Sequence, residues 1–156
     1  MNGVDVVILM GSKSDLEFSE KIAKSLEKFG LSYVMRVASA HKTPEKVLEI
    51  VREYEGAIFI TVAGRSNALS GFVDANTSGP VIACPPYSSK FSGMDVLSSL
   101  RMPSGVAPLV VLEPENAALA AAKILALKDE KVRERVREYQ KRKKREVEEA
   151  DREISC

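Results

Sequence analysis

Residues 4–15 read VDVVILMGSKSD, an almost continuous apolar and β-branched run that stops at a glycine followed by hydroxyl and charged side chains. A short run without polar alternation is typical of a strand that is buried on both faces of a parallel sheet. A helix is expected directly after it, because Ser14 and Glu17 have the spacing of a capping box and Gly30 supplies a stop. The stretch therefore predicts a buried strand that passes into a covering helix.

The same alternation recurs along the chain. Further apolar runs, each followed by turn residues, predict strands at residues 33–38, 57–63, 81–84 and 109–112. Helical patterns follow at residues 43–54, 68–76, 93–100 and 115–127, and Thr43 with Pro44 opens the first of these. This alternation predicts an α/β fold, a three-layer α/β/α flavodoxin-like doubly wound parallel sheet. Ligands of such sheets bind outside the carboxyl ends of the strands.

The chain changes character after Leu127. Residues 128–154 contain 11 basic and 9 acidic side chains. An apolar stripe runs through them at helical spacing, formed by Val132, Val136, Tyr139, Val147, Ala150 and Ile154. The stripe is too narrow to build a core of its own. We therefore predict a domain of residues 1–127 and a C-terminal helical extension of residues 128–156, which packs on its own domain or, as its length favours, on a neighbouring subunit.

Composition and charge limit the classes of partner. The formal net charge is +1, and the residues outside 128–154 carry 12 basic and 13 acidic side chains, so we expect no nucleic-acid partner. The basic cluster at residues 141–145 precedes several acidic residues, which favours a solvated helix over a phosphate-binding arm. Hydrophobic residues make up 45% of the chain, which is typical of a globular protein and not of a membrane-spanning one.

Cysteine and histidine usage bears on compartment and metal binding. Cys84 and Cys156 are far apart and lack metal or redox spacing, which indicates a reducing compartment. Residues 4–10 resemble a strand and not a signal peptide, so we predict a cytoplasmic protein. One histidine and scattered carboxylates give no metal-ligand spacing, and we predict no metal site.

The only histidine, His41, lies in the turn between the second predicted strand and its helix. An imidazole can gain or lose a proton near neutral pH, and the free amides at the start of a helix can bind an anion beside it. The loop at residues 10–15 occupies the same edge and lacks the spacing of a P-loop or a dinucleotide-binding turn. Together the two loops predict an anion site beside His41. The alternative is a surface histidine near a helix cap, with Ser14 and Asp15 serving only as caps.

Two further loops follow the third and fourth predicted strands. Residues 63–71, AGRSNALSG, are small enough to approach a planar ligand closely, and Arg65 could hold an anion, although tight packing explains this composition equally well. Residues 84–87, CPPY, could wall a cleft. Cys84 has no second histidine or cysteine beside it, which favours a buried structural thiol over a nucleophile.

In this order, the loops resemble the PurE family of purine biosynthesis. The matching motifs are GSKSD (11–15), SAHKTP (39–44), the glycine loop (63–71), DVLSSLRMP (95–103) and NAALAA (116–121). The resemblance covers nearly the whole chain through Leu127. The family has two branches: a mutase that rearranges a carboxyamino-imidazole ribonucleotide, and a carboxylase that joins carbon dioxide directly to aminoimidazole ribonucleotide (AIR).

The chain departs from the mutase pattern in two places. The mutase has an arginine where Lys42 stands, and a motif A-H-L-P-G-M where residues 68–72 read ALSGF. Residues 65–67 and 84–86 look instead like the carboxylase branch that is shared with the animal bifunctional enzyme. The resemblance therefore implies reversible carboxylation of AIR to carboxyaminoimidazole ribonucleotide, with the mutase as the alternative. A non-catalytic module that binds a phosphorylated nucleotide is a distant alternative.

The resemblance also implies roles for single residues. His41 would be catalytic, taking a proton from the ring carbon after that carbon attacks carbon dioxide, with no metal, biotin, ATP or other cofactor. The substrate-binding residues would be Ser12, Ser39 and Lys42 for the phosphate, Asp15 for the ribose hydroxyls, and Gly71 for the base or carboxylate region through its backbone. A dry pocket lined by Ala40, Gly64 and Gly71 would receive the carbon dioxide. A homo-octamer is implied as well.

Overall fold

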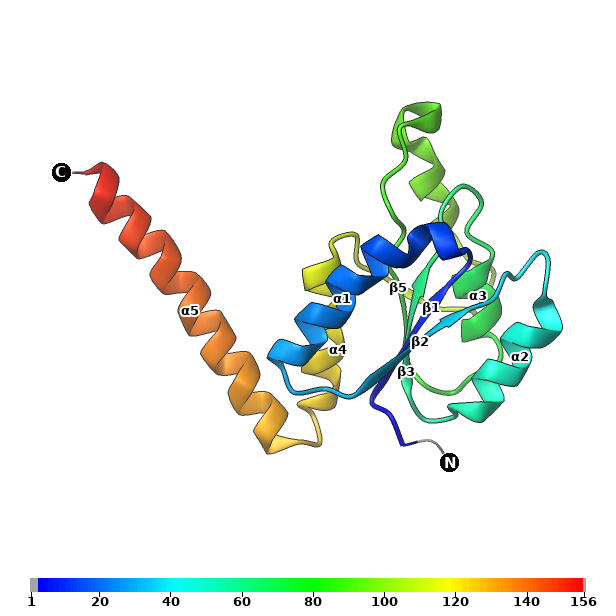
Figure 1. The fold of residues 1–156 in the computed structure, drawn as a ribbon, viewed down its shortest axis with the longest axis horizontal. Helices are drawn as coiled ribbons and strands as arrows, with labels where there is room; N and C mark the ends of the chain where they lie inside the picture. Colours follow the sequence, from blue (N-terminus) through cyan, green and yellow to red (C-terminus); the bar gives the residue numbers. More distant parts are fainter. Residues whose placement is uncertain (1–2, 156) are drawn as a thin grey trace.

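The structure, a computed structural model, describes residues 3–155. A parallel sheet of five strands in the order β2-β1-β3-β4-β5 forms its centre (Figure 1). The strands are β1 (Val6–Met10), β2 (Tyr33–Val37), β3 (Ile58–Val62), β4 (Val81–Ala83) and β5 (Leu109–Val110). β1 lies between β2 and β3, with Ile8 opposite Met35 on one side and Ile60 on the other. This strand order confirms the expected doubly wound α/β fold.

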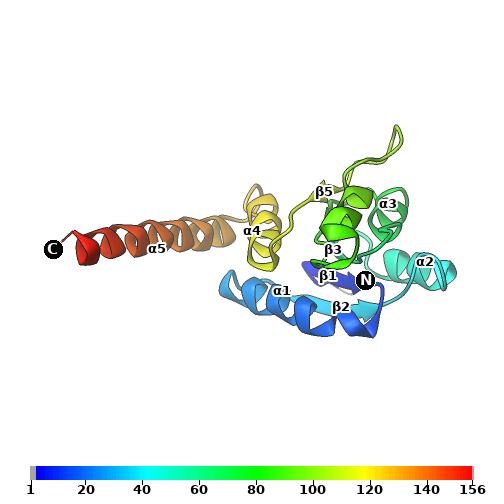
Figure 2. The same cartoon turned by 90° about the horizontal axis from the view of Figure 1, so that it is seen from above.

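Helices cover both faces of the sheet and give the molecule three layers (Figure 2). α1 (Leu16–Lys28) and α4 (Pro114–Leu125) lie on one face, and α2 (Pro44–Glu53) and α3 (Leu69–Asp74) lie on the other. Successive side chains of β1 point to opposite faces, so Ile8 packs with α1 and α4 while Leu9 packs with α2 and α3. All of β1 is buried for this reason, as its continuous apolar sequence predicts.

The first helix begins differently from the prediction. Ser14 does not cap it, because a 3-10 turn, η1 (Lys13–Asp15), precedes α1. The hydroxyl of Ser12 caps that turn instead, accepting a hydrogen bond from the Ser14 backbone N–H at 3.2 Å. The predicted capping box is therefore wrong, and the capping hydroxyl lies two positions closer to the strand.

The segment after β4 also departs from the prediction. It forms a 3-10 helix, η2 (Lys90–Ser99), in place of an α-helix, and its first turn is interrupted at Phe91, Ser92 and Gly93, which all have positive φ. In Figure 1, η2 stands above the edge of the sheet where the strands end. Several of its large apolar side chains are exposed, namely Phe91, Met94 and Leu97.

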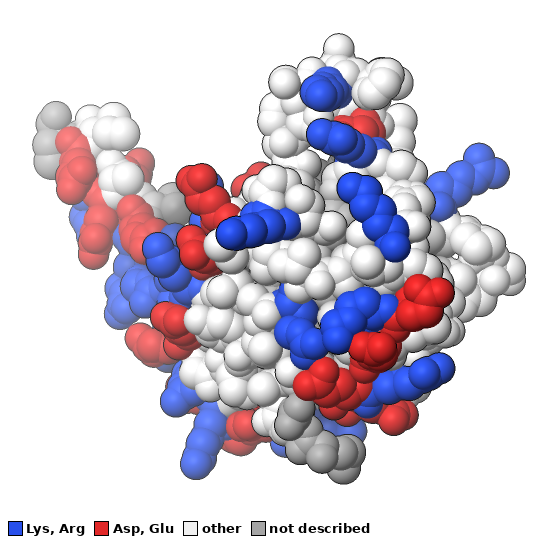
Figure 3. Space-filling model, turned by 45° about the vertical axis from the view of Figure 1, so that its right-hand side comes forward, with Lys and Arg blue, Asp and Glu red and all other residues white. Residues whose placement is uncertain are grey.

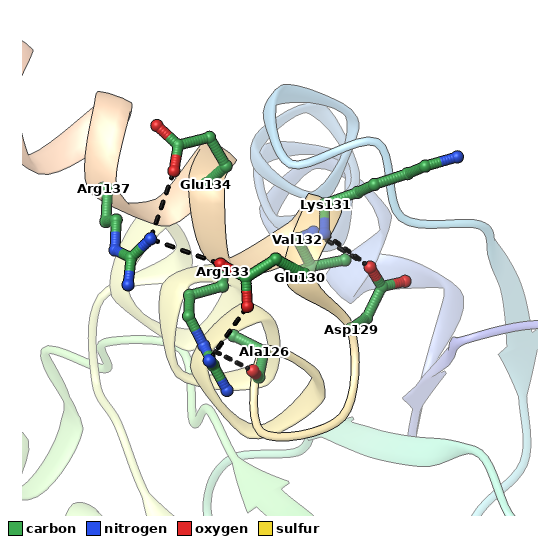
Figure 4. Close-up of polar contacts among 8 residues, drawn as sticks. All are labelled: Ala126, Asp129, Glu130, Lys131, Val132, Arg133, Glu134 and Arg137. Atoms are coloured by element: carbon green, nitrogen blue, oxygen red, sulfur yellow. Dashed lines mark hydrogen bonds and ion pairs between the residues drawn. The ribbon is translucent and has the colours of Figure 1, made fainter.

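A long helix, α5 (Glu130–Ile154), extends away from the body of the molecule (Figures 1 and 2). Asp129 caps its start by accepting hydrogen bonds at Oδ1 from the backbone N–H groups of Lys131 and Val132, at 2.8 and 3.2 Å (Figure 4). Arg133 Nε donates to the carbonyl of Ala126 at 3.0 Å, which ties the first turn to the end of α4. These contacts fix the angle at which α5 leaves the domain.

Only the first half of the apolar stripe on α5 is covered within this chain. Val132, Val136 and Tyr139 belong to the core that α1 and α4 form on the sheet. By contrast, Val147 is 71% exposed and Ile154 is 85% exposed. The start of the extension is thus continuous with the core of residues 1–127, and packing of its second half on a neighbouring subunit stays a prediction.

Positive and negative side chains are interspersed on the face drawn in Figure 3. That face carries no continuous basic surface over the part of the chain that is drawn. No helix within residues 3–155 is both long enough and apolar enough to span a bilayer.

Candidate active site

A pocket of about 380 Å³ opens where the strands of the sheet end. The loops that follow β1, β2, β3 and β4 all contribute to its lining, as expected for a doubly wound sheet. The structure brings most of the predicted site residues together in it: Ser12, Asp15, Ser39, His41 and Lys42.

The first loop brings hydroxyl groups and a carboxylate to the pocket. Ser12 Oγ accepts hydrogen bonds from Ser14, from the backbone N–H and from the side-chain hydroxyl at 2.9 Å. Burial raises the pKa of Asp15, and the positive charge of Arg65 opposes that rise. No other residue within 3–155 forms a hydrogen bond with the Asp15 carboxylate, so this group is available to accept hydrogen bonds from ligand hydroxyls.

The second loop is closed by its own hydrogen bonds. Ser39 N–H donates to Thr43 Oγ1 at 2.9 Å, and Thr43 N–H donates to the Ser39 carbonyl at 2.8 Å. Ser39 Oγ accepts from the backbone N–H of Lys42 at 3.1 Å. His41 and Lys42 are exposed at the tip of this turn, and neither side chain has a hydrogen bond or ion pair with another described residue. Both are therefore available to a ligand in the pocket.

The third loop reaches the pocket through Gly64, Arg65 and Ser66. A Cβ added to Gly64 would lie 3.7 Å from Pro86 Cγ, an ordinary contact distance, so packing within the chain does not require a glycine there. Arg65 has a φ of 60°, in the left-handed region that residues with side chains seldom adopt. Its backbone N–H donates to Asp95 Oδ2 at 3.2 Å.

Gly71 is the predicted site residue that does not line the pocket. It lies in α3, where an added Cβ would be 2.9 Å from Met102 Sδ and 3.6 Å from Val106 Cγ1. Gly71 therefore does not share the lining of this pocket with Ala40 and Gly64, because residues that follow η2 occupy the space beside it. Its predicted contact with the ligand stays a prediction.

The sequence did not single out Lys90, which lines the pocket from the first position of η2. With Lys42 and Arg65 it places three cations around the pocket, against the single carboxylate of Asp15. No short motif marks this lysine, because it belongs to a segment whose path is set by tertiary packing. The resulting excess of positive charge suits a ligand that carries phosphate or carboxylate groups.

The structure also bears on two other kinds of site, a cysteine nucleophile and a metal site. Cys84 is fully buried, and burial, with a smaller contribution from Glu113, raises the pKa of its thiol to about 12. The thiol therefore stays protonated at neutral pH and is unsuited to act as a nucleophile. Among residues 3–155, no group of three or more His, Cys, Asp or Glu side chains is arranged to hold a metal ion.

Comparisons with known proteins agree on one family. Residues 5–146 match the family described as AIR carboxylase. The phosphoribosylaminoimidazole carboxylase of Archaeoglobus fulgidus is 68% identical over 154 residues, which are 97% of this chain and 86% of that protein. A bifunctional phosphoribosylaminoimidazole carboxylase/phosphoribosylaminoimidazole succinocarboxamide synthetase of Drosophila melanogaster is 56% identical over 126 residues, 78% of this chain and 29% of that longer protein. The crystal structure of Treponema denticola PurE superposes with a TM-score of 0.94 at 50% identity and covers 97% of this chain and 98% of that one.

Proposed function

Because this chain belongs to the AIR carboxylase family of purine biosynthesis enzymes, we propose that it catalyses the reversible addition of carbon dioxide to AIR, which gives carboxyaminoimidazole ribonucleotide. The observation that carries the proposal is the grouping of an unpaired imidazole, His41, with hydroxyls and cations in one pocket at the strand ends. Such a pocket offers a proton acceptor beside a binding site for an anionic, sugar-containing ligand.

The choice of the carboxylase branch rests on residues that line the pocket or lie next to it. Lys42 stands where the mutase pattern has an arginine, and residues 65–67 read RSN, as in the carboxylase pattern. The bifunctional animal enzymes support the same choice, because the Drosophila protein named for this carboxylase activity is 56% identical over the aligned region. The mutase is the second candidate and differs in its substrate, a carboxyamino-imidazole ribonucleotide that is an isomer of the carboxylated product.

The proposed ligand contacts follow the charges in the pocket. Ser12 and Ser39 offer hydroxyls and Lys42 offers a cation to the phosphate, while Asp15 accepts hydrogen bonds from the ribose hydroxyls. Binding energy from this sugar-phosphate end would hold the aminoimidazole ring at the rest of the pocket. Carbon dioxide is small and neutral, so the main contribution of the protein is to keep the two reactants close together and correctly oriented.

The chemical step needs only one proton carrier. The amino group of AIR donates electrons into its ring, and the electron-rich ring carbon attacks carbon dioxide to form a carbon–carbon bond. That carbon is then tetrahedral and still carries its hydrogen. The neutral His41 imidazole takes this proton, the C–H electron pair restores the aromatic ring, and the carboxylate remains on the product. In the reverse direction the protonated imidazole returns the proton and carbon dioxide leaves.

A labelling experiment separates the candidates. Purified enzyme would be given AIR with isotopically labelled carbon dioxide, and in a parallel reaction the carboxyamino isomer of the product. The proposal predicts rapid labelling of the carboxylated product from AIR, and no use of the isomer faster than its own breakdown to AIR. Direct conversion of the isomer would establish the mutase instead. If neither substrate reacted while calorimetry showed AIR binding, a non-catalytic nucleotide-binding module would be the remaining account.

We further propose that the protein assembles as a homo-octamer in the cytoplasm. Apolar side chains exposed on the single chain support an assembly, and they include Met94, Leu97, Leu100, Val147 and Ile154. The lobe that contains η2, at the top of Figure 3, is largely uncharged. Sedimentation should give a mass eight times the 17.1 kDa of one chain. The buried free thiol of Cys84 supports a reducing compartment.

A further inference from the structure

The loop after β3 holds a strained residue at the pocket. Arg65 has a φ of 60°, and for a residue with a Cβ this left-handed conformation is unfavourable. A glycine would adopt it without that penalty, yet the chain has an arginine there. Strained backbone persists only where surrounding contacts enforce it, and it is concentrated at functional sites. The contacts that enforce it here identify a further residue.

One turn of η2 supplies those contacts. Asp95 Oδ2 accepts from the Arg65 backbone N–H at 3.2 Å. Ser98 Oγ accepts from the Asn67 backbone N–H at 2.9 Å, and its hydrogen is shared between the carbonyls of Asp95, at 2.7 Å, and Arg65, at 3.3 Å. Asn67 Nδ2 donates to Ser99 Oγ at 2.8 Å in the interior. The Ser98 hydroxyl lies closer to the Asp95 carbonyl than to the Arg65 carbonyl, so its hydrogen bond to Arg65 is the weaker of the two. The strongest hydrogen bond to Arg65 in this group is therefore the one that the Asp95 carboxylate accepts from the Arg65 N–H.

Asp95 contacts the backbone N–H of Arg65 and not its guanidinium group. No ion pair within 4.0 Å joins the two side chains in the described part of the chain. Arg65 lines the pocket, and its positive charge acts on the Asp15 carboxylate in the first loop. The aspartate therefore bonds to the backbone of the arginine and leaves its positive charge available to a ligand.

We propose that Asp95 is a positioning residue, which holds residue 65 in the left-handed conformation through the Arg65 N–H and so keeps the guanidinium at the pocket. The inference rests on the proposed function, under which the guanidinium pairs with an anionic group of the substrate or product. Loss of the carboxylate lets the loop relax toward negative φ and moves the guanidinium away from that group. A displacement of about 1 Å in a positioned group can lower the rate by roughly a hundredfold.

A double-mutant cycle on kcat/KM tests this role. Asp95→Ala should lower kcat/KM by roughly ten- to a hundredfold, and Arg65→Ala by at least as much. The double variant should be no worse than Arg65→Ala alone within about twofold, since no guanidinium is left to position. Asp95→Asn keeps an acceptor oxygen and should restore kcat/KM to within about fivefold of the wild type. Additive losses in the cycle, or an Asp95→Asn variant as impaired as Asp95→Ala, would overturn the proposal.

Asp74 provides a matched control. Its Oδ2 also accepts from a distant backbone N–H, that of Ala107 at 2.7 Å, but it does not line the pocket. Asp74→Ala should therefore reduce thermal stability with a small effect on kcat/KM that adds to the effect of Arg65→Ala.

If Asp95→Ala did not fold, the same cycle would be run with Ser98→Ala. A several-fold loss of kcat/KM that disappears in the Arg65→Ala background supports the proposal, and an additive loss overturns it.

A crystal structure of Asp95→Ala keeps this inference separate from the proposed function. If the wild-type enzyme failed to carboxylate AIR, the proposed function would fail by itself, and the φ of residue 65 in the variant would still decide the positioning role. A shift of residue 65 to negative φ supports that role. A φ that stays near 60° overturns it, because the conformation would then not depend on Asp95.

Discussion

The loops after β2 and β3 line the same pocket but are held in opposite ways. Ser39 and Thr43, four positions apart, bond to each other and close the loop that carries His41. Arg65 is held by Asp95, which lies 30 positions further along the chain. One loop is fixed by its own short sequence, and the other by the packing of η2. The proposed proton carrier, His41, should therefore be insensitive to distant substitutions that disturb the loop of Arg65.

Among substitutions in these two loops, His41→Asn should cause the largest loss of activity. Asparagine retains polarity and approximate size but cannot carry a proton, so kcat should fall by roughly a thousandfold in both directions. The dissociation constant of AIR, measured by calorimetry, should rise by less than about fivefold. Since the His41 side chain has no hydrogen bond to another described residue, the melting temperature should hardly change. Normal turnover in this variant would remove His41 from the mechanism.

Lys42→Ala should affect binding more than chemistry. The substitution removes a cation next to the imidazole but leaves the backbone N–H that donates to Ser39 Oγ at 3.1 Å. A lost charged contact costs about 1.5–3 kcal/mol, so the KM for AIR should rise by roughly ten- to a hundredfold with kcat changed by less than about threefold. Steady-state kinetics at saturating carbon dioxide measure both constants. A drop in kcat alone would assign Lys42 a chemical role.

Thr43→Val tests whether the loop after β2 is held from within. Valine has nearly the same shape as threonine but cannot accept the Ser39 N–H, which donates to Thr43 Oγ1 at 2.9 Å. We expect about 1 kcal/mol of lost unfolding free energy in urea and a several-fold fall in kcat/KM. Unlike Asp95→Ala, this variant should leave the effect of Arg65→Ala undiminished. An unchanged kcat/KM would show that the loop keeps its shape without this bond.

Asp15→Asn should have the smallest effect, on the stability of the free enzyme. Burial raises the pKa of Asp15 in the folded protein, so the ionised carboxylate is disfavoured by folding. The protonated carboxyl therefore favours the folded state. This contribution to stability is complete below the pKa of Asp15 in the unfolded chain, and it is lost as the pH rises through the higher pKa of the folded protein. Calorimetry should therefore show a melting temperature about 1–3 °C higher for the variant at pH 7 and no gain at pH 3.

Glu17→Gln is a suitable control for that measurement, because Glu17 is exposed in the first turn of the same helix. It should not reproduce the gain at pH 7. A lower melting temperature for Asp15→Asn at pH 7 would mean that the ionised carboxylate stabilises the free protein, contrary to the direction of its pKa shift.

The sequence could predict what depends on local patterns. The apolar run of β1 predicts a strand buried on both faces, and the structure confirms it. The turn that exposes His41 could be predicted because Thr43 and Pro44 lie within a few residues of it. The cap at Ser12 was missed because the sequence does not show that a 3-10 turn precedes α1.

Features that depend on distant packing were not predictable in this way. Lys90 lines the pocket only because the interrupted start of η2 brings it there. Gly71 lies outside the lining of this pocket because Met102 and Val106 pack beside α3, and that packing cannot be deduced from the composition of the glycine loop. The link between Arg65 and Asp95 joins two segments that no local pattern connects.

A crystal structure of the wild-type enzyme with AIR bound would show directly whether His41 can carry the proton. We expect the phosphate at Ser12, Ser39 and Lys42, and an imidazole nitrogen of His41 within about 3.5 Å of the ring carbon that receives the carboxyl group. AIR bound outside this pocket, or bound inside it with the His41 imidazole directed away from the ring, would contradict this expectation.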